Sequence, residues 1–138
     1  PYTTLFRSID LDPTLVARAE RTSPGPRWFT GDLAESCEIL GVGFLGSFDV
    51  IVAAGNVVSF IAESDRRRVL ENFARLLSPG GRLVSGFGTA RGYSLESYVA
   101  DASAAGFDDP QVFSTWDLRP ASEDPGFAVV ISPKPASE

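Results

Sequence analysis

The sequence predicts an α/β protein with a doubly wound, mostly parallel sheet that ends in an antiparallel hairpin. Apolar runs of strand length alternate with amphipathic helical segments along the chain, which is typical of parallel strands joined by crossover helices. The last two strand-like runs, 111–116 and 127–131, have only a polar loop between them, which favours a hairpin. With 138 residues, the chain has the length of one domain, which excludes a second full one.

The first predicted unit is a strand, a helix and a second strand. Residues 9–12 form a short run with an acidic end, and Pro13 suits the first turn of the helix that follows. The proline- and glycine-rich run 23–26 is expected to end this helix. Residues 27–30 then have the composition of a short strand, which the glycine and aspartate at 31–32 terminate.

Two segments follow before the next helix. Residues 38–46 are apolar but contain three glycines, so the sequence leaves open a loop or a frayed helix there. Residues 48–54 are apolar without the two-residue alternation of a half-exposed strand. A run of this kind predicts a parallel strand that is buried on both faces, at the centre of the sheet.

A second amphipathic helix is predicted to begin at Ser64 or Asp65, either of which suits the N-cap. Its apolar residues recur at helical spacing, whereas Arg66 and the other charged residues are expected to face water. The Pro-Gly-Gly run at 79–81 is predicted to end this helix.

The remaining elements complete the predicted sheet. Residues 82–87 have the composition of a buried strand, 88–93 that of a loop and 95–106 that of a third helix, which leads to the terminal hairpin. The segment 133–138 is expected to be a flexible tail.

Composition excludes several classes of function. The 12 basic and 18 acidic residues give a net charge of −6, which disfavours nucleic acid as a partner. No segment approaches the roughly 18 apolar residues that a membrane span needs, and no signal peptide is recognisable, so a cytoplasmic location is expected. With no histidine and one cysteine, the chain lacks histidine-based catalysis, histidine-ligated metals and internal disulfides, and no metal site is predicted.

Residues at the carboxyl ends of the predicted strands are the candidates for ligand binding, because ligands of open parallel sheets bind there. The carboxylate of Asp10 suits two ribose hydroxyls, since it only accepts hydrogen bonds. Asp32, after the next strand, suits an adenine amine, although capping a turn explains it equally well. Gly55 permits close approach of a ligand, and Asn56 offers a donor and an acceptor beside it or a cap for the following segment.

Four motifs together resemble those of the class I S-adenosylmethionine-dependent methyltransferases. They are Asp10-x-Asp12-Pro13, Gly31-Asp32-Leu33, the run 48–52 and the run 77–84, in this order and spacing. Residues 54–58 and 92–95 further resemble a subgroup of small bacterial methyltransferases. The resemblance covers nearly all of 9–131. It implies a Rossmann-like fold, S-adenosylmethionine as cofactor and methyl transfer to a small-molecule acceptor.

The resemblance also implies a set of cofactor-binding residues at three strand ends: Asp10, Leu11, Asp32, Leu33, Ala54, Gly55 and Asn56. Asp10 is expected to hold the ribose hydroxyls, and Leu11 and the pair at 32–33 to contact the adenine. Residues 54–56 are expected to lie near the methionine part of the cofactor.

On the acceptor side, Asn56 and Tyr93 are the candidate catalytic residues, with Arg91 and Trp116 as further candidate contacts. Methyl transfer does not require a particular acid or base. The methyl group of the cofactor is already activated, so positioning the acceptor in line with it supplies most of the catalysis.

The chain departs from the family at its start. The family's first strand and glycine-rich loop, which hold the methionine end of the cofactor, should precede Ile9. Residues 1–8 instead resemble a translated sequencing adapter, so the expected organisation is a non-native segment 1–8 and a partial methyltransferase domain 9–132. Because the missing strand normally lies between the strands that end at Asp10 and Ala54, its loss is expected to leave two open edges, an unstable chain and weak cofactor binding.

Two other interpretations of the same residues stay open. A nicotinamide-dependent oxidoreductase also uses an acidic residue after an early strand, and residues 52–55 are similar to the Asn-Asn-Ala-Gly of short-chain dehydrogenases. The Tyr-x-x-x-Lys of that family is absent, however, because the single lysine is Lys134. The other alternative is a non-catalytic α/β module in which the acidic residues only cap helices.

Overall fold

The computed structural model of the protein describes residues 6–23 and 25–136. Its strands are β1 (Arg7–Asp10), β2 (Arg27–Thr30), β3 (Phe48–Ala53), β4 (Leu77–Gly88), β5 (Gln111–Phe113) and β6 (Phe127–Pro133). Its α-helices are α1 (Pro13–Thr22), α2 (Ser36–Leu40), α3 (Arg66–Leu76) and α4 (Leu95–Ala104). Short 3-10 turns are η2 (Leu33–Glu35), η3 (Val42–Phe44), η4 (Val57–Phe60) and η5 (Glu63–Asp65). This alternation of strands and helices confirms the α/β class.

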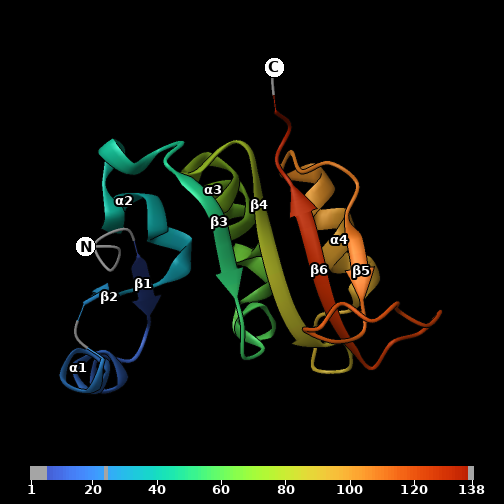
Figure 1. Cartoon of the computed structure of the whole chain (residues 1–138), viewed down its shortest axis with the longest axis horizontal. Helices are drawn as coiled ribbons and strands as arrows, with labels where there is room; N and C mark the ends of the chain where they lie inside the picture. The colour runs from blue at the N-terminus through green and yellow to red at the C-terminus, as the bar shows by residue number, and fades with distance from the viewer. Residues whose placement is uncertain (1–5, 24, 137–138) are drawn as a thin grey trace.

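The described strands form two sheets that are not hydrogen-bonded to each other (Figure 1). β1 and β2 pair in parallel, with Asp10 opposite Thr30. The larger sheet has the order β3-β4-β6-β5, in which β3 and β4 are parallel and β6 is antiparallel to both of its neighbours. The terminal antiparallel hairpin of β5 and β6 is thus confirmed.

Helices α3 and α4 cover one face of the larger sheet (Figure 1). The apolar residues of α3 recur at helical spacing and are buried: Val69, Leu70, Phe73 and Leu76. In α4, the Tyr98 ring lies 5.0 Å from that of Phe87 in β4, and its hydroxyl shares a hydrogen bond of 2.5 Å with Ser85. These contacts anchor β4, whose end carries part of the candidate site.

The first helix forms as its sequence predicts. The Asp12 carboxylate accepts a hydrogen bond of 2.8 Å from the Thr14 N–H, and Pro13 occupies the first turn. Val16 is the buried residue of α1, and the helix packs on β1 and β2. The segment 38–46, which the sequence left open, contains the end of α2 and the turn η3.

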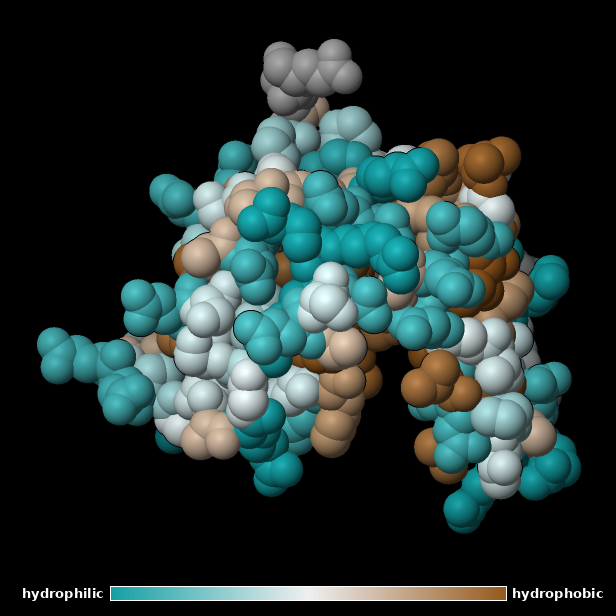
Figure 2. Space-filling model, turned by 180° about the vertical axis from the view of Figure 1, so that it is seen from behind, coloured by the Kyte–Doolittle hydropathy of each residue, from teal (hydrophilic) through white to brown (hydrophobic). Residues whose placement is uncertain are grey.

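β3 is an edge strand of its sheet, so the prediction of a central strand is wrong for the described chain. Ile51 and Ala53 pack in the core beneath the helices, whereas Val50 and Val52 are 39% and 61% exposed. One face of β3 and its edge toward β1 are therefore open. Figure 2 shows a deep hollow between the part of the molecule that holds β1 and β2 and the rest. Two open edges that face each other are what the resemblance predicted.

The boundaries of β1 and β4 differ from those expected. β1 begins at Arg7, so Arg7 and Ser8 belong to a strand although they fall in the segment expected to be non-native; residues 1–5 lie outside the described part. β4 begins at Leu77, directly after α3. The run 79–81 therefore lies within this long strand, where the pairing with β3 is irregular, rather than forming a separate turn.

The last described residues are hydrogen-bonded to β4. β6 extends to Pro133, and the backbone N–H of Lys134 donates to the Gly81 carbonyl at 2.8 Å. The Nζ of Lys134 donates to the Leu77 carbonyl at 2.6 Å, at the point where α3 gives way to β4. Of the segment 133–138, residues 137 and 138 lie outside the described part.

Candidate cofactor and acceptor site

The carboxyl ends of β1, β3 and β4 meet the same edge of the molecule, the lower edge in Figure 1. β2 runs parallel to β1 and ends beside it. The ends of β1 and β2 thus lie on one side of the hollow and those of β3 and β4 on the other.

Asp10 and Leu11 are both exposed at the end of β1. The Oδ1 of Asp10 accepts the Asp12 N–H at 2.9 Å, which fixes the carboxylate and leaves Oδ2 for a ligand. The Leu11 side chain is 70% exposed. A fixed carboxylate next to an exposed apolar side chain suits the sugar and the base of a nucleoside.

Asp32 is exposed at the end of β2, and its Oδ1 caps the turn η2 by accepting the Ala34 N–H at 2.9 Å. The capping interpretation is therefore correct, and it is compatible with a ligand on the second oxygen. The Gly31 N–H donates to the Asp10 carbonyl at 2.9 Å, which ties the two strand ends together. Leu33 is partly buried against the core, so less of it is available to a base than of Leu11.

The turn after β3 connects the ends of two strands. Gly55 and Asn56 have φ angles of 69° and 63°, a left-handed conformation that glycine and asparagine adopt at least cost. The Oδ1 of Asn56 accepts the Gly88 N–H at 2.6 Å, and its backbone N–H donates to the Gly86 carbonyl at 3.3 Å. Ala54 is exposed beside them. Because Oδ1 is engaged, the Asn56 amide presents its Nδ2 donors to a ligand.

Tyr93 is not available as a catalytic residue. It is 1% exposed, and its hydroxyl donates to Oδ2 of Asp101 at 2.5 Å. Burial, together with that carboxylate, raises the pKa of the Tyr93 hydroxyl well above its usual range, so the group stays protonated. A buried, neutral and engaged hydroxyl does not reach an acceptor at the strand ends, so Tyr93 supports the loop it belongs to.

Arg91 and Trp116 lie near the end of β4 and are exposed. A Cβ at Gly88 would lie 3.2 Å from the Cδ and Nε of Arg91. A Cβ at Gly86 would collide with the Trp116 ring, so that ring lies directly on the strand backbone. Trp116 was expected in a strand, but it follows β5 in a loop. The turn at Asn56 is hydrogen-bonded to the same two residues, Gly86 and Gly88, so both side chains lie near it.

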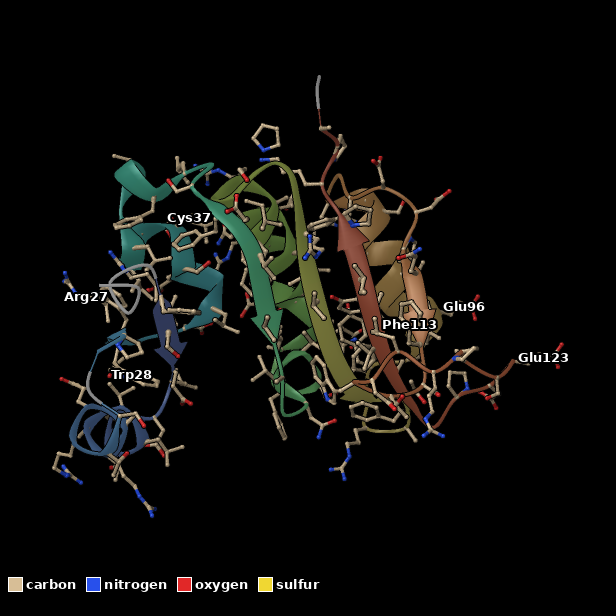
Figure 3. All side chains as sticks on the ribbon, viewed as in Figure 1. Arg27, Trp28, Cys37, Glu96, Phe113 and Glu123 are labelled. Carbon is tan, nitrogen blue, oxygen red and sulfur yellow. The ribbon has the colours of Figure 1, made fainter. Side chains whose placement is uncertain are left out.

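A cavity of about 320 Å³ adjoins the loop that follows β4. Thr89 and Ser94 line it from that loop, and Glu96 and Glu123 line it from α4 and from the loop before β6. Figure 3 shows both glutamates on the side of the molecule away from β1.

None of the described helices combines the length and the apolar character that crossing a membrane requires.

Sequence reasoning missed the residues that support this edge. Arg66 lies over the Tyr93 ring, Asp101 holds the Tyr93 hydroxyl, and Gly86 leaves room for Trp116. These partners come from different elements, and no motif or spacing in the sequence signals them.

A family model described as a methyltransferase domain matches residues 3–83. The chain belongs to this family. It is similar to a TehB-like SAM-dependent methyltransferase from Corynebacterium glutamicum, with 36% identity, a TM-score of 0.83, and coverage of 93% of this chain and 67% of that one. No curated protein matches it.

Two less similar structures share the fold of this methyltransferase domain. One is a SAM-dependent methyltransferase, possible histamine N-methyltransferase, from Thermotoga maritima, with 16% identity, coverage of 94% and 72%, and a TM-score of 0.70. The other is the N-methyltransferase NodS from Bradyrhizobium japonicum, with 19% identity, the same coverage of the two chains and a TM-score of 0.65. These matches confirm the Rossmann-like fold.

Membership of the family makes S-adenosylmethionine the cofactor and methyl transfer the reaction, which confirms the resemblance seen in the sequence. The similarities give no support to a nicotinamide-dependent reaction or to a non-catalytic module. The methyl acceptor is a small molecule or a macromolecule.

Proposed function

We propose that S-adenosylmethionine binds across the lower end of the hollow, at the carboxyl ends of β1, β2 and β3, and that the acceptor of this methyltransferase domain is a small molecule. The observation that carries the proposal is the distribution of polar groups around the hollow. Asp10 and Asp32 stand at its β1–β2 side, and the turn at 54–56 stands at its β3–β4 side, at the same edge. This distribution fits a ligand with a nucleoside at one end and an amino acid at the other.

Each residue has a role that its fixed geometry supports. The free oxygen of Asp10 accepts from the ribose hydroxyls, and Leu11 packs on the adenine ring. The second oxygen of Asp32 accepts from the adenine amine, with Leu33 at the ring edge. Residues 54–56 approach the methionine part, where the left-handed turn removes side-chain bulk at Gly55 and directs the Asn56 amide.

S-adenosylmethionine supplies an activated methyl group, so this chain has to orient the acceptor and exclude water rather than generate a strong base. Asn56, Arg91 and Trp116 are the proposed acceptor-side residues, and Asn56 is the proposed catalytic contact. The cavity of about 320 Å³ beside the loop after β4 lies on the side of the molecule away from β1, so we do not assign the acceptor to it. The net charge of −6 argues against a nucleic acid.

We also propose that, in the parent protein, a strand from the native sequence that precedes Ile9 completes the sheet between β1 and β3. The support is the pair of open edges, both of them on strands that pair in parallel on their other side. An added strand would pair with the open backbone edges of β1 and β3 and stand next to the proposed cofactor site.

Calorimetric titration with S-adenosylmethionine tests the site. We expect weak binding by the 138-residue chain and tight binding once the upstream residues, recovered by sequencing the gene across the Ser8–Ile9 junction, are restored. In the restored chain, Asp10→Ala with Asp32→Ala should weaken binding roughly 100-fold or more, because two charge-assisted hydrogen bonds are lost. Asp12→Asn, which removes a neighbouring charge but keeps the cap of α1, is the matched control. Unchanged affinity in the double variant would refute the proposed site.

A further inference from the structure

Arg66 makes contacts that an ordinary surface arginine does not make. It is the first residue of α3, which begins near the edge where β3 ends (Figure 1). Its guanidinium carbon lies 3.9 Å from the centroid of the Tyr93 ring, and its Nη2 donates to the Gly92 carbonyl at 2.8 Å. The prediction that Arg66 faces water is therefore wrong. The Nε of Arg66 is buried without a hydrogen-bond partner among the described residues. The Tyr93 ring and the Gly92 carbonyl therefore hold the guanidinium in place although its Nε–H makes no hydrogen bond there.

The aromatic ring beneath Arg66 is itself fixed on its other sides. The Tyr93 ring lies 5.4 Å from that of Tyr98 and 6.1 Å from that of Phe87. Its hydroxyl is bonded to Asp101 of α4. The Tyr93 ring is thus fixed against β4 and α4, and Arg66 connects it to α3.

The backbone that Arg66 contacts is next to the proposed acceptor-side residues. Gly92 has a φ of 100°, and Arg91 precedes it. The Arg91 side chain packs against Gly88, whose N–H is bonded to Asn56. At its other end, the loop is held by Thr89, whose N–H donates to the Gly126 carbonyl at 3.0 Å. Between these two attachments only residues 90 and 91 are left to be positioned.

We propose that Arg66 is a positioning residue that clamps the loop 89–92 and thereby sets the place of Arg91 beside Asn56. The proposal rests on the proposed function for its role in methyl transfer, but the clamp itself is a property of the chain. Removing the guanidinium frees the Gly92 carbonyl and uncovers the Tyr93 ring, so the segment 90–92 opens more often while the core stays folded.

Limited proteolysis with trypsin measures this opening in the 138-residue chain, because the Arg91–Gly92 bond lies in the clamped segment. Cleavage at Arg82–Leu83, within β4, reports global unfolding in the same digest. We expect Arg66→Ala to raise the rate of Arg91 cleavage relative to Arg82 cleavage roughly fivefold or more. Arg67→Ala, which removes the same charge from the next, exposed position of α3, should leave the ratio unchanged.

Lysine variants keep the test valid if Arg66→Ala does not fold. Arg66→Lys retains a cation over the ring but loses the planar donor group, so it should give a ratio between those of the unchanged chain and Arg66→Ala, whereas Arg67→Lys should have no effect. Equal ratios for Arg66→Lys and Arg67→Lys, or a parallel rise of both cleavages in Arg66→Ala, would overturn the clamp.

Titration of the restored chain with S-adenosylmethionine separates the two proposals. The Arg66→Ala variant should keep the affinity for S-adenosylmethionine, because Arg66 contacts the acceptor-side loop alone. A selective rise in Arg91 cleavage combined with no binding by the restored chain would leave the clamp standing and refute the proposed site. Loss of binding in Arg66→Ala, with tight binding in Arg67→Ala, would overturn the assignment of this loop to the acceptor side.

Discussion

Asp32 has two tasks that a single substitution can separate. Its Oδ1 accepts the Ala34 N–H at 2.9 Å and caps η2, while its other oxygen is the proposed acceptor for the adenine amine. Asp32→Asn keeps an oxygen for the cap and replaces the other oxygen with an NH₂ group, which donates where an acceptor is needed. Asp32→Ala removes both functions.

The expected magnitudes follow from these contacts. Loss of the cap costs about 1 kcal/mol in the free energy of unfolding, whereas asparagine caps as well as aspartate. The turn that Asp32 caps is packed, since Ala34 is 3% exposed and accepts a 2.8 Å hydrogen bond from the Asn72 side chain. A hydrogen bond to a charged group is worth about 1.5–3 kcal/mol, so both substitutions should weaken S-adenosylmethionine binding roughly 10-fold to 100-fold.

Urea denaturation and calorimetric titration of the restored chain give the two readouts. We expect Asp32→Asn to be as stable as the unchanged chain but to bind as weakly as Asp32→Ala, which alone should be destabilised. If Asp32→Asn bound the cofactor with full affinity while Asp32→Ala bound it weakly, Asp32 would act only as a cap and its role at the adenine would be refuted.

Three further substitutions or conditions test the rest of the structure. Val52→Lys, on the open face of β3, should change the free energy of unfolding by less than about 0.5 kcal/mol and reduce self-association, because a charge discourages strand pairing; sedimentation that shows undiminished association would contradict this. Gly86→Ala should displace the Trp116 ring, because a Cβ there collides with it, and tryptophan fluorescence should shift to longer wavelength; an unshifted spectrum would show that the ring does not lie on β4. Burial raises the pKa of both Tyr93 and Tyr98, so above about pH 10 the unfolded chain releases two protons that the folded chain keeps. The contribution of each tyrosine to the free energy of unfolding is therefore fully present below that pH, and above it the free energy should fall by up to about 1.4 kcal/mol per pH unit for each tyrosine. Urea titrations at several pH values should show a shallower fall for Tyr98→Phe.

The fold was predictable where it depends on local periodicity. The cap and first turn of α1, the apolar face of α3 and the hairpin of β5 and β6 all follow from residues close together in the chain. The environment of β3 was not predictable in this way. An apolar run shows which environment a strand suits, but not whether a neighbour covers it. Val50 and Val52 remain exposed because no described element packs on the face that they share.

The candidate site was predictable where it depends on strand ends. Asp10, Asp32 and Asn56 each follow a predicted strand, and the parallel sheet brings such positions to one edge. Tyr93 follows a predicted strand closely in the sequence, which suggested that it contacts the acceptor. Its burial results from Asp101 and Arg66, which lie on two different helices, and helical periodicity does not reveal that the first residue of α3 reaches a loop.

The open edges link the stability of this chain to its binding of cofactor. The proposed nucleoside contacts are on β1 and β2, the proposed methionine contacts follow β3, and no strand hydrogen bond connects the two groups in the described chain. Their relative position is therefore held by the packing of η2 and α2 on α3 instead of a shared sheet. A strand inserted between β1 and β3 would fix that position and pair with the backbone edges that are open in the described chain. Since a ligand that contacts both groups favours the same relative position, docking of the strand and binding of the cofactor should strengthen each other by the same factor.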